Sequence, residues 1–273
     1  MQGILLSAIN IYPVKSAKGI SLNSWRVGER GFELDRRWMV VDSHDRFLTQ
    51  RQHPQMALIT VSIDKESLIL EAPGMQRIPV PLRAPSRTLI QAQVWDDLVQ
   101  ALPLGDEISV WLSDYLSLQA KLVFMPDQSR RFVDSEYSKN GDHYGFADAF
   151  PFLIISQASL HELNRRLETP LPMNRFRPNL VLSNCEPFAE DTWKEIRIGP
   201  IPFHIVKPCS RCAIITVDPA TGKIGKEPLR TLATFRKTNN EVYFGENAIH
   251  GKEGILNIGD SVEVLEFAKN PAV

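Results

Sequence analysis

Short runs of β-forming residues recur along the whole chain, separated by glycine, proline, aspartate and asparagine, and they constrain the fold more than any other feature. In the first half we expect strands at residues 5–12, 38–42, 57–63 and 67–71. In the second half we expect them at 152–155, 179–183, 196–198, 203–206, 213–217 and 262–265. This pattern predicts a mainly β (α+β) fold of barrel-like sheets rather than a series of βαβ units.

Two segments have the periodicity of amphipathic helices. Apolar residues at 108, 111, 112, 115 and 116 predict a helix over residues 106–118. A second helix is expected from Ser156 or Ser159 to residue 166, where Ser159 and Glu162 have the spacing of a capping box. A chain of 273 residues suggests about two domains. We place the boundary after the first helix, which gives domains at 1–118 and 119–268.

The composition is that of an ordinary globular protein. Hydrophobic residues make up 43% and charged residues 23%, which excludes an intrinsically disordered chain. The net charge of -1 gives no overall attraction to nucleic acid or to an anionic membrane. No apolar run approaches the roughly 18–20 residues of a membrane span, and the first residues do not resemble a signal peptide. Three cysteines favour reduced thiols and a cytoplasmic location.

The segment 207–212, with the sequence KPCSRC, is the most informative one for chemistry. Cys209 and Cys212 are separated by two residues and have Lys207 and Arg211 as neighbours. These positive charges would favour the thiolate form, which binds soft metals or attacks electrophiles. An expected strand follows this segment. The second half of the chain opens with a polar stretch at residues 126–142, which we expect to be a loop.

The cysteines also allow three other interpretations. A structural zinc site needs four ligands, and Cys185 and His204 alone could complete the set. A thioredoxin-like redox pair is disfavoured because the motif precedes a strand instead of opening a helix. The third interpretation is that the cysteines are buried and inert. It suits Cys185 well, but it suits Cys209 and Cys212 poorly because of their charged neighbours.

Basic side chains gather in three separate segments. Lys15 and Ser16 follow the first expected strand, and Arg36 lies in an acidic, basic and aromatic cluster before the second one. Arg177 and Asn179 stand at the start of a later strand. The planar guanidinium group of arginine binds phosphate and pterin-type acceptors through two parallel hydrogen bonds. Each segment alone is more often part of a surface ion pair, but together with the cysteine motif they favour a bound anion.

Asp148 stands out among the carboxylates because its neighbours are aromatic and small. Such surroundings would raise its pKa and make it a proton donor. The alternative is a loop carboxylate that binds backbone amides, and the sequence leaves both open. The six histidines are scattered without metal-ligand spacing and receive no role.

Taken together, these segments resemble the MOSC superfamily, which is named after the C-terminal domain of molybdenum cofactor sulfurases. Within it they resemble the mitochondrial amidoxime-reducing component and its bacterial counterparts. The matching stretches are residues 12–16, 35–36 with 38, 146 with 148–152, 176–179, 189–193 and 209–222. The resemblance covers nearly the whole chain and implies an N-terminal β-barrel domain over 1–118 and a β-barrel MOSC domain over 119–268.

The resemblance also implies a molybdenum cofactor (Mo-molybdopterin) held between the two domains. Cys212 would bind the metal, and Asp148 would lie near it and deliver protons. The residues expected around the pterin and its phosphate are Lys15, Ser16, Arg36, Arg177, Asn179, Ser210 and Arg211. Cys209 would lie next to the metal ligand without binding the metal itself, and Cys185 would be structural.

The activity implied by the resemblance is the two-electron, two-proton reduction of N-hydroxylated compounds such as amidoximes, hydroxylamines and N-hydroxylated bases, a detoxification chemistry. Three cysteines cannot hold an iron–sulfur cluster as well as molybdenum. Electrons are therefore expected from a separate flavoprotein, cytochrome b5-like protein or ferredoxin. Neither a mitochondrial presequence nor a membrane anchor is expected. The alternatives are a non-catalytic carrier of molybdenum cofactor or of persulfide sulfur on Cys212, and a zinc-stabilised binding module.

Overall fold

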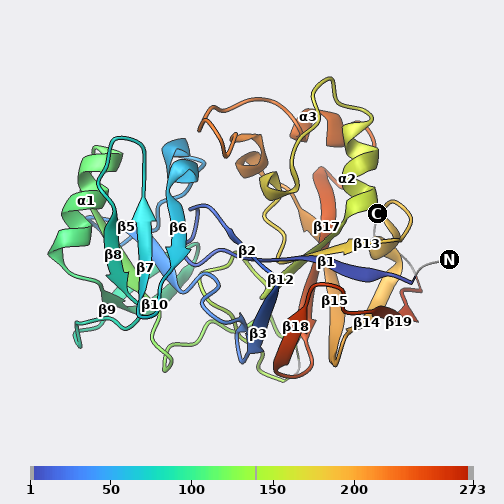
Figure 1. The fold of residues 1–273 in the computed structure, drawn as a ribbon, viewed down its shortest axis with the longest axis horizontal. Coiled ribbons are helices and arrows are strands. Elements are labelled where there is room, and N and C mark those ends of the chain that lie inside the picture. Colours follow the sequence, from blue (N-terminus) through green and yellow to red (C-terminus); the bar gives the residue numbers. More distant parts are fainter. Residues whose placement is uncertain (1–2, 139, 270–273) are drawn as a thin grey trace.

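The computed structural model describes residues 3–138 and 140–269 and is built mostly of strands in two lobes (Figure 1). The strands are β1 Leu5–Ile11, β2 Ile20–Leu22, β3 Ser24–Gly28, β4 Gly31–Phe32, β5 Trp38–Asp42, β6 Thr60–Ile63, β7 Ser67–Glu71, β8 Ile78–Pro81, β9 Ile90–Val94, β10 Asp97–Pro103, β11 Ala120–Phe124, β12 Phe152–Ser156, β13 Leu180–Ser183, β14 Trp193–Ile198, β15 Ile201–Ser210, β16 Lys237–Thr238, β17 Glu241–His250, β18 Gly254–Asn257 and β19 Val262–Phe267. The α-helices are α1 Asp106–Leu116, α2 Gln157–Asn164 and α3 Leu229–Leu232, and the 3-10 helices are η1 Pro54–Leu58, η2 Met173–Arg175, η3 Ala189–Thr192 and η4 Ala213–Thr216. The predicted mainly β fold is confirmed.

The largest sheet joins the two ends of the chain. Its nine strands run in the order β19-β14-β15-β17-β12-β13-β1-β2, with β16 added to β17. Strands β12 and β13 are parallel, and the other pairs of this sheet are antiparallel. Phe152, Phe203 and Trp193 are fully or almost fully buried in its core. Because β1 pairs with β13, the first strand of the chain lies in the sheet of the C-terminal half.

The other lobe holds most of the N-terminal half. It contains the four-stranded sheet β5-β11-β10-β9 and the three-stranded sheet β6-β7-β8. Helix α1 lies on its outer side (Figure 1) and buries Ile108, Trp111 and Leu112. The smaller sheet β18-β3-β4 pairs a C-terminal strand with two N-terminal ones. The curled sheets of this lobe agree with the barrel-like N-terminal part that the sequence predicts, whereas the boundary after residue 118 stays a prediction.

Several predicted elements differ from those observed. Strands at 38–42 and 67–71 are confirmed, but β6 begins only at Thr60 because Pro54 starts a 3-10 helix. The predicted capping box of Ser159 and Glu162 is wrong. Ser156 is the N-cap of α2, and its hydroxyl oxygen accepts a hydrogen bond from the Ser159 amide. The strand predicted at 213–217 is wrong as well, because residues 213–216 form η4.

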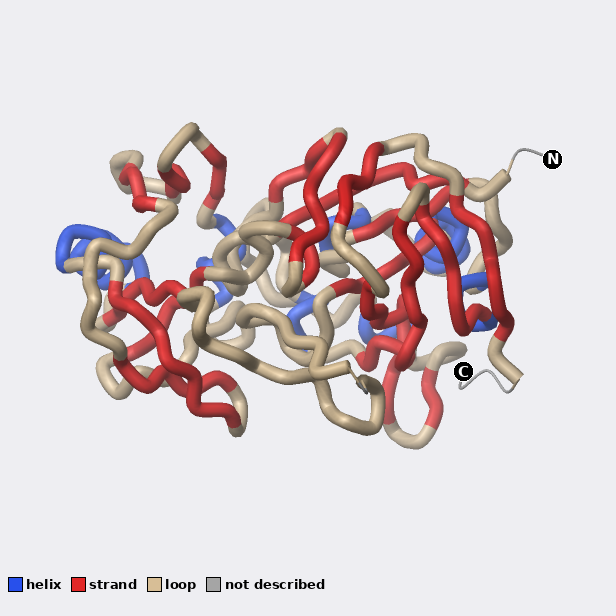
Figure 2. The backbone as a smooth tube through the Cα atoms, turned by 90° about the horizontal axis from the view of Figure 1, so that it is seen from below, coloured by secondary structure: helices blue, strands red, loops and turns tan. Residues whose placement is uncertain are grey.

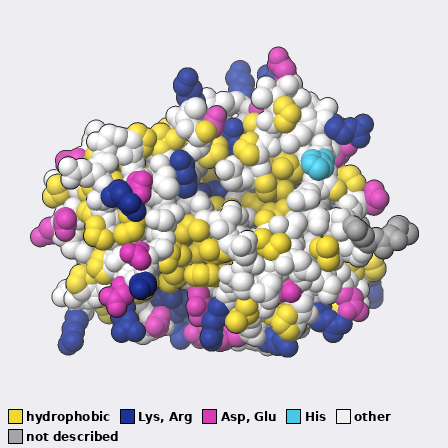
Figure 3. All heavy atoms as spheres, in the orientation of Figure 1, with side chains coloured by type: hydrophobic (Ala, Val, Ile, Leu, Met, Phe, Trp, Pro, Cys, Tyr) yellow, Lys and Arg dark blue, Asp and Glu magenta, His cyan; other side chains and the backbone are white. Residues whose placement is uncertain are grey.

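The space between the lobes is occupied by connecting segments (Figure 2). The expected loop at 126–142 has no strand longer than an isolated bridge in its described part, and residue 139 lies outside the described residues. Acidic and basic side chains alternate around the edge of one face (Figure 3), in keeping with the balanced net charge. In the described ranges, no helix combines the length and the hydrophobicity needed to cross a bilayer.

Candidate functional site

Strand β15 carries the cysteine motif to the space between the lobes. Its ladder with β17 is regular up to Ile205, and the register then shifts twice before Ser210. The Arg211 amide still donates to Val242 O at 2.7 Å, and the chain then leaves the sheet and enters η4. Ile215 of η4 is 1% exposed and packs into the core. Burial of this side chain outweighs the strand preference of the β-branched run and explains why residues 213–216 do not continue as a strand.

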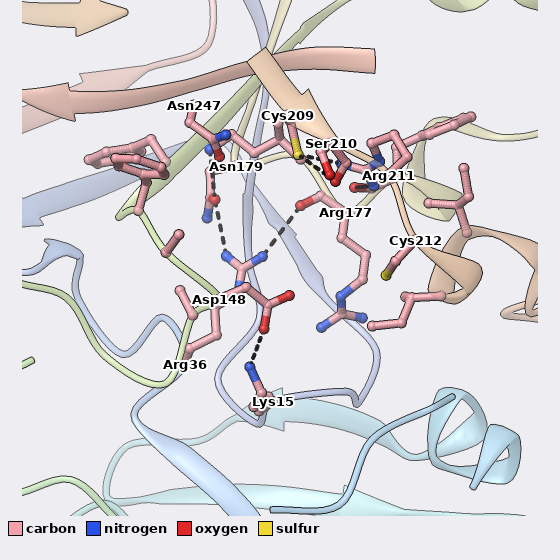
Figure 4. Close-up of a pocket in the computed structure, with 18 of the residues that line it drawn as sticks. Lys15, Arg36, Asp148, Arg177, Asn179, Cys209, Ser210, Arg211, Cys212 and Asn247 are labelled. Carbon is pink, nitrogen blue, oxygen red and sulfur yellow. Dashed lines mark hydrogen bonds and ion pairs between the residues drawn. The ribbon is translucent and has the colours of Figure 1, made fainter. Parts of the chain in front are cut away.

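The two cysteines have different surroundings. Arg211 Nη1 donates to Cys209 Sγ at 3.0 Å. Burial nevertheless raises the pKa of the Cys209 thiol, and Arg211 offsets this only in part. The expected thiolate is therefore wrong for Cys209, because desolvation outweighs the nearby charge. Cys212 carries an exposed, unbridged thiol, and Figure 4 shows its sulfur beside the Arg177 side chain. Both cysteines line the pocket, and Cys212 is the more exposed of the two.

Lys15 and Asp148 form an ion pair across the lobes. Lys15 Nζ donates to Asp148 Oδ1 at 2.6 Å and to Phe146 O at 2.7 Å. Burial lowers the pKa of Lys15, and the charge of Asp148 opposes this effect. Partial desolvation at the pocket wall would raise the pKa of Asp148, but the charge and hydrogen bond of Lys15 outweigh it and hold the pKa below its usual range. The predicted raised pKa of Asp148 is therefore wrong, because this carboxylate has a cationic partner.

Two arginines enclose an aromatic ring at the back of the site. The guanidinium carbons of Arg36 and Arg177 lie 4.4 Å and 4.3 Å from the centre of the Tyr12 ring. Arg36 Nη1 donates to Asp35 Oδ2 at 2.6 Å and to Asn179 Oδ1 at 3.0 Å. Burial and the charge of Arg36 lower the pKa of Arg177 to about 10. This cluster keeps two positive charges close together, which an anion would stabilise.

The predicted site residues line one pocket. Its volume is about 280 Å³, and all nine candidates contribute to its wall: Lys15, Ser16, Arg36, Asp148, Arg177, Asn179, Ser210, Arg211 and Cys212. Figure 4 shows the labelled side chains converging from both lobes. Among the charged described residues of the wall, five are basic and Asp148 is acidic. The pocket therefore combines the exposed Cys212 thiol with an excess of positive charge.

Some wall residues were missed by the sequence analysis. Gln50 donates from Nε2 to Ser16 O at 2.7 Å and lies beside Thr49. Asn247 belongs to β17, which was not predicted. The polar run at residues 49–52 could have pointed to Thr49 and Gln50. No sequence signal pointed to Asn247, because its strand was not predicted.

The zinc interpretation finds no support. Over residues 3–138 and 140–269, no three histidine, cysteine, aspartate or glutamate side chains are grouped so as to hold a metal ion. Cys185 and His204, the proposed extra ligands, do not line the pocket with Cys209 and Cys212. Burial raises the pKa of Cys185 to about 11, in keeping with a structural thiol.

Comparison with known proteins gives matches along most of the chain. The model of the MOSC N-terminal beta barrel domain matches residues 4–119, and that of the MOSC domain matches residues 141–263. Mitochondrial amidoxime reducing component 2 of Rattus norvegicus is 36% identical, over 94% of this chain and 82% of its own length. Mitochondrial amidoxime-reducing component 1 is 34% identical in Mus musculus, over 93% of this chain and 80% of that protein, and in Homo sapiens, over 93% and 81%.

Proposed function

Because this chain belongs to the family of MOSC-domain proteins that includes the mitochondrial amidoxime-reducing components, we propose that it reduces N-hydroxylated compounds with the help of a molybdenum cofactor. The observation that carries the proposal is the pocket itself, in which the exposed Cys212 thiol faces an excess of basic side chains. Thiolate is a ligand for soft metals, and arginine binds phosphate. Both requirements of a molybdopterin are met in one cavity.

The donor set fits this cofactor. Cys212 would bind the metal, while Arg36, Arg177 and Arg211 would hold the anionic pterin and its phosphate. Arg211 Nε is buried and has no hydrogen-bond partner among the described residues, so it has a donor to offer to a ligand. When bound, the cofactor would supply the two-electron reduction, and the protein would supply placement and charge.

The Lys15–Asp148 pair is suited to proton delivery. Reduction of an N-hydroxyl group to N–H consumes two electrons and two protons and releases one water molecule. Lys15 carries a proton on Nζ, and burial makes this proton easier to release. Asp148 holds the ammonium group at the pocket wall. We assign to this pair the role that the sequence gave to Asp148 alone.

Electrons would come from a separate electron-transfer protein, and the proposed location is the cytoplasm. The separate donor is inferred because three cysteines cannot hold an iron–sulfur cluster as well as molybdenum. The location is inferred because so few cysteines favour reduced thiols. A chemical reductant replaces this partner in a first assay, so the proposed reaction is tested without knowing the natural donor.

The test compares wild type with Cys212→Ala and with Cys185→Ala as the matched control, all expressed with molybdate in a cofactor-producing host. We expect molybdenum and pterin near one per chain in wild type and in Cys185→Ala, and reduction of benzamidoxime by both. Cys212→Ala should lose at least about 100-fold in rate, because the metal loses its protein ligand.

Normal molybdenum binding by Cys212→Ala, together with no amidoxime reduction by wild type, would refute the reductase. A mass increase of about 32 Da on wild type alone under sulfur-donor conditions would instead support the persulfide carrier.

A further inference from the structure

The hairpin between β9 and β10 turns through an unusual residue. Val94 pairs directly with Asp97, so Trp95 and Asp96 form a two-residue turn. Trp95 has a φ of +54°, a left-handed conformation that glycine or asparagine supplies in most turns of this kind. A bulky aromatic residue in this conformation is strained, and such strain is concentrated at functional sites. The position points to a function of the indole ring.

The ring of Trp95 is held from two sides and reaches Asp148. The Phe47 ring lies 4.9 Å away, and the Arg51 guanidinium carbon lies 4.3 Å from the ring centre. Trp95 Nε1 donates to Asp148 Oδ1 at 3.1 Å. A residue of the N-terminal lobe thereby contacts a wall residue from the C-terminal half.

Trp95 and Lys15 donate to the same oxygen of Asp148. Within the described residues no donor is found for the other oxygen, Oδ2. Figure 4 shows one carboxylate oxygen bonded to Lys15 and the other turned toward the space beside Arg177 and Cys212. The Asp148 side chain is 57% exposed, so a molecule in the pocket reaches this second oxygen.

We propose that Trp95 is a positioning residue that, together with Lys15, directs Asp148 Oδ2 into the pocket as a hydrogen-bond acceptor for the substrate. The inference rests on the proposed function and names the substrates that it favours. Amidoximes and N-hydroxyguanidines carry an NH₂ group beside the N–OH group. The NH₂ group and the N–OH group can each donate a hydrogen bond to a carboxylate. Tertiary amine N-oxides carry no such donor. The site therefore favours amidoximes and N-hydroxyguanidines over N-oxides.

The first test needs no cofactor and no activity. In ¹H–¹⁵N spectra of ¹⁵N-labelled protein, Trp95→Phe identifies the Trp95 indole signal by its absence. Asp148→Ala should move this signal upfield because the charged acceptor is lost. The Trp111 indole, which donates to Gln76 O at 2.7 Å on the outer side of the same lobe, is the internal control and should not move. A Trp95 signal at the same position in Asp148→Ala and wild type would overturn the proposal, whatever the activity of the protein.

The second test uses the cofactor-loaded enzyme with a chemical reductant. Trp95→Phe keeps an aromatic ring and loses the N–H donor. We expect kcat/KM for benzamidoxime to fall by about 3- to 10-fold, the usual range for one hydrogen bond, mostly through KM, with a smaller loss for trimethylamine N-oxide. Trp111→Phe, which loses a similar bond away from the pocket, should leave both substrates unaffected. Equal losses for the two substrates in Trp95→Phe would overturn the specificity role, whereas a wild-type enzyme inactive on both would contradict the proposed function instead.

Discussion

Glu246 is a carboxyl group buried on β17, next to the pocket residue Asn247. Its exposed fraction is 2%, and Oε1 has no hydrogen-bond partner among the described residues. Burial and the nearby charges of Asp191 and Glu190 raise its pKa to about 9. Arg236 pairs with Asp191, and its positive charge offsets these effects at Glu246 only in part. The folded protein therefore keeps a proton on Glu246 at neutral pH.

This proton makes stability depend on pH. Between the unfolded pKa of about 4.3 and the folded value, the native state binds more protons than the unfolded one, so stability falls as pH rises. At about 1.4 kcal/mol per pH unit for one proton, we expect wild type to lose on the order of 4 kcal/mol between pH 6 and pH 9. Glu246→Gln keeps a hydrogen-bond donor toward Asp191 without a titrating proton and should flatten this loss in urea unfolding. Glu168→Gln, at an exposed position, serves as control, and equal slopes for all three proteins would contradict the assignment.

At the scale of elements, the β15–β17 ladder bends where the cysteine motif leaves it. Gly245 of β17 lies opposite the shifted register and has a φ of +80°. A Cβ atom there would lie 2.5 Å from Ile155 Cγ1 and 2.8 Å from Ile154 O. The neighbouring strand β12 thus approaches too closely for any side chain, and the bend in the ladder depends on this glycine.

Replacement of Gly245 by alanine should cost both backbone strain and a steric clash. We expect Gly245→Ala to lower the free energy of unfolding by about 3 kcal/mol or more. Gly74→Ala is the matched control, because Gly74 has a φ of +76° but open space around it; it should lose about 1–2 kcal/mol through strain alone. The difference between the two variants in chemical denaturation measures the clash, and equal losses would show that β12 yields to the new methyl group.

How far the sequence predicts these elements depends on how local their causes are. The run Trp38–Val41 is 0% exposed, and its continuous apolar pattern was sufficient to place β5. Strand β17 escaped prediction because Gly245, Glu246 and Asn247 interrupt its apolar pattern. The nine pocket candidates were found through motifs near strand ends, but the roles of Trp95 and the ionised state of Asp148 depend on contacts between distant segments. A local sequence pattern cannot predict contacts between segments that are far apart in the chain.

At the scale of the whole molecule, the pocket concentrates positive charge where the two lobes meet. Lys15 and Arg36 come from the N-terminal half, and Arg177, Lys207 and Arg211 come from the C-terminal half. Like charges held together at low dielectric repel one another. An anion bound among them relieves this repulsion and links both halves of the chain, so the cofactor-free protein should gain stability from anions.

Inorganic pyrophosphate is a suitable probe of this effect. Bound to the native state only, it should add about 2.7 kcal/mol at 100 times its dissociation constant, which raises Tm by several degrees for a chain of this size. Potassium chloride at equal ionic strength screens exposed charges without filling the pocket and should not reproduce the rise. Arg177→Gln should weaken the response, because one of the two guanidinium groups at Tyr12 is lost, and the cofactor-loaded protein should respond less because its anion site is filled. A rise in Tm that is the same for pyrophosphate and chloride, or unchanged in Arg177→Gln, would show that the positive charges of the pocket do not form an anion site.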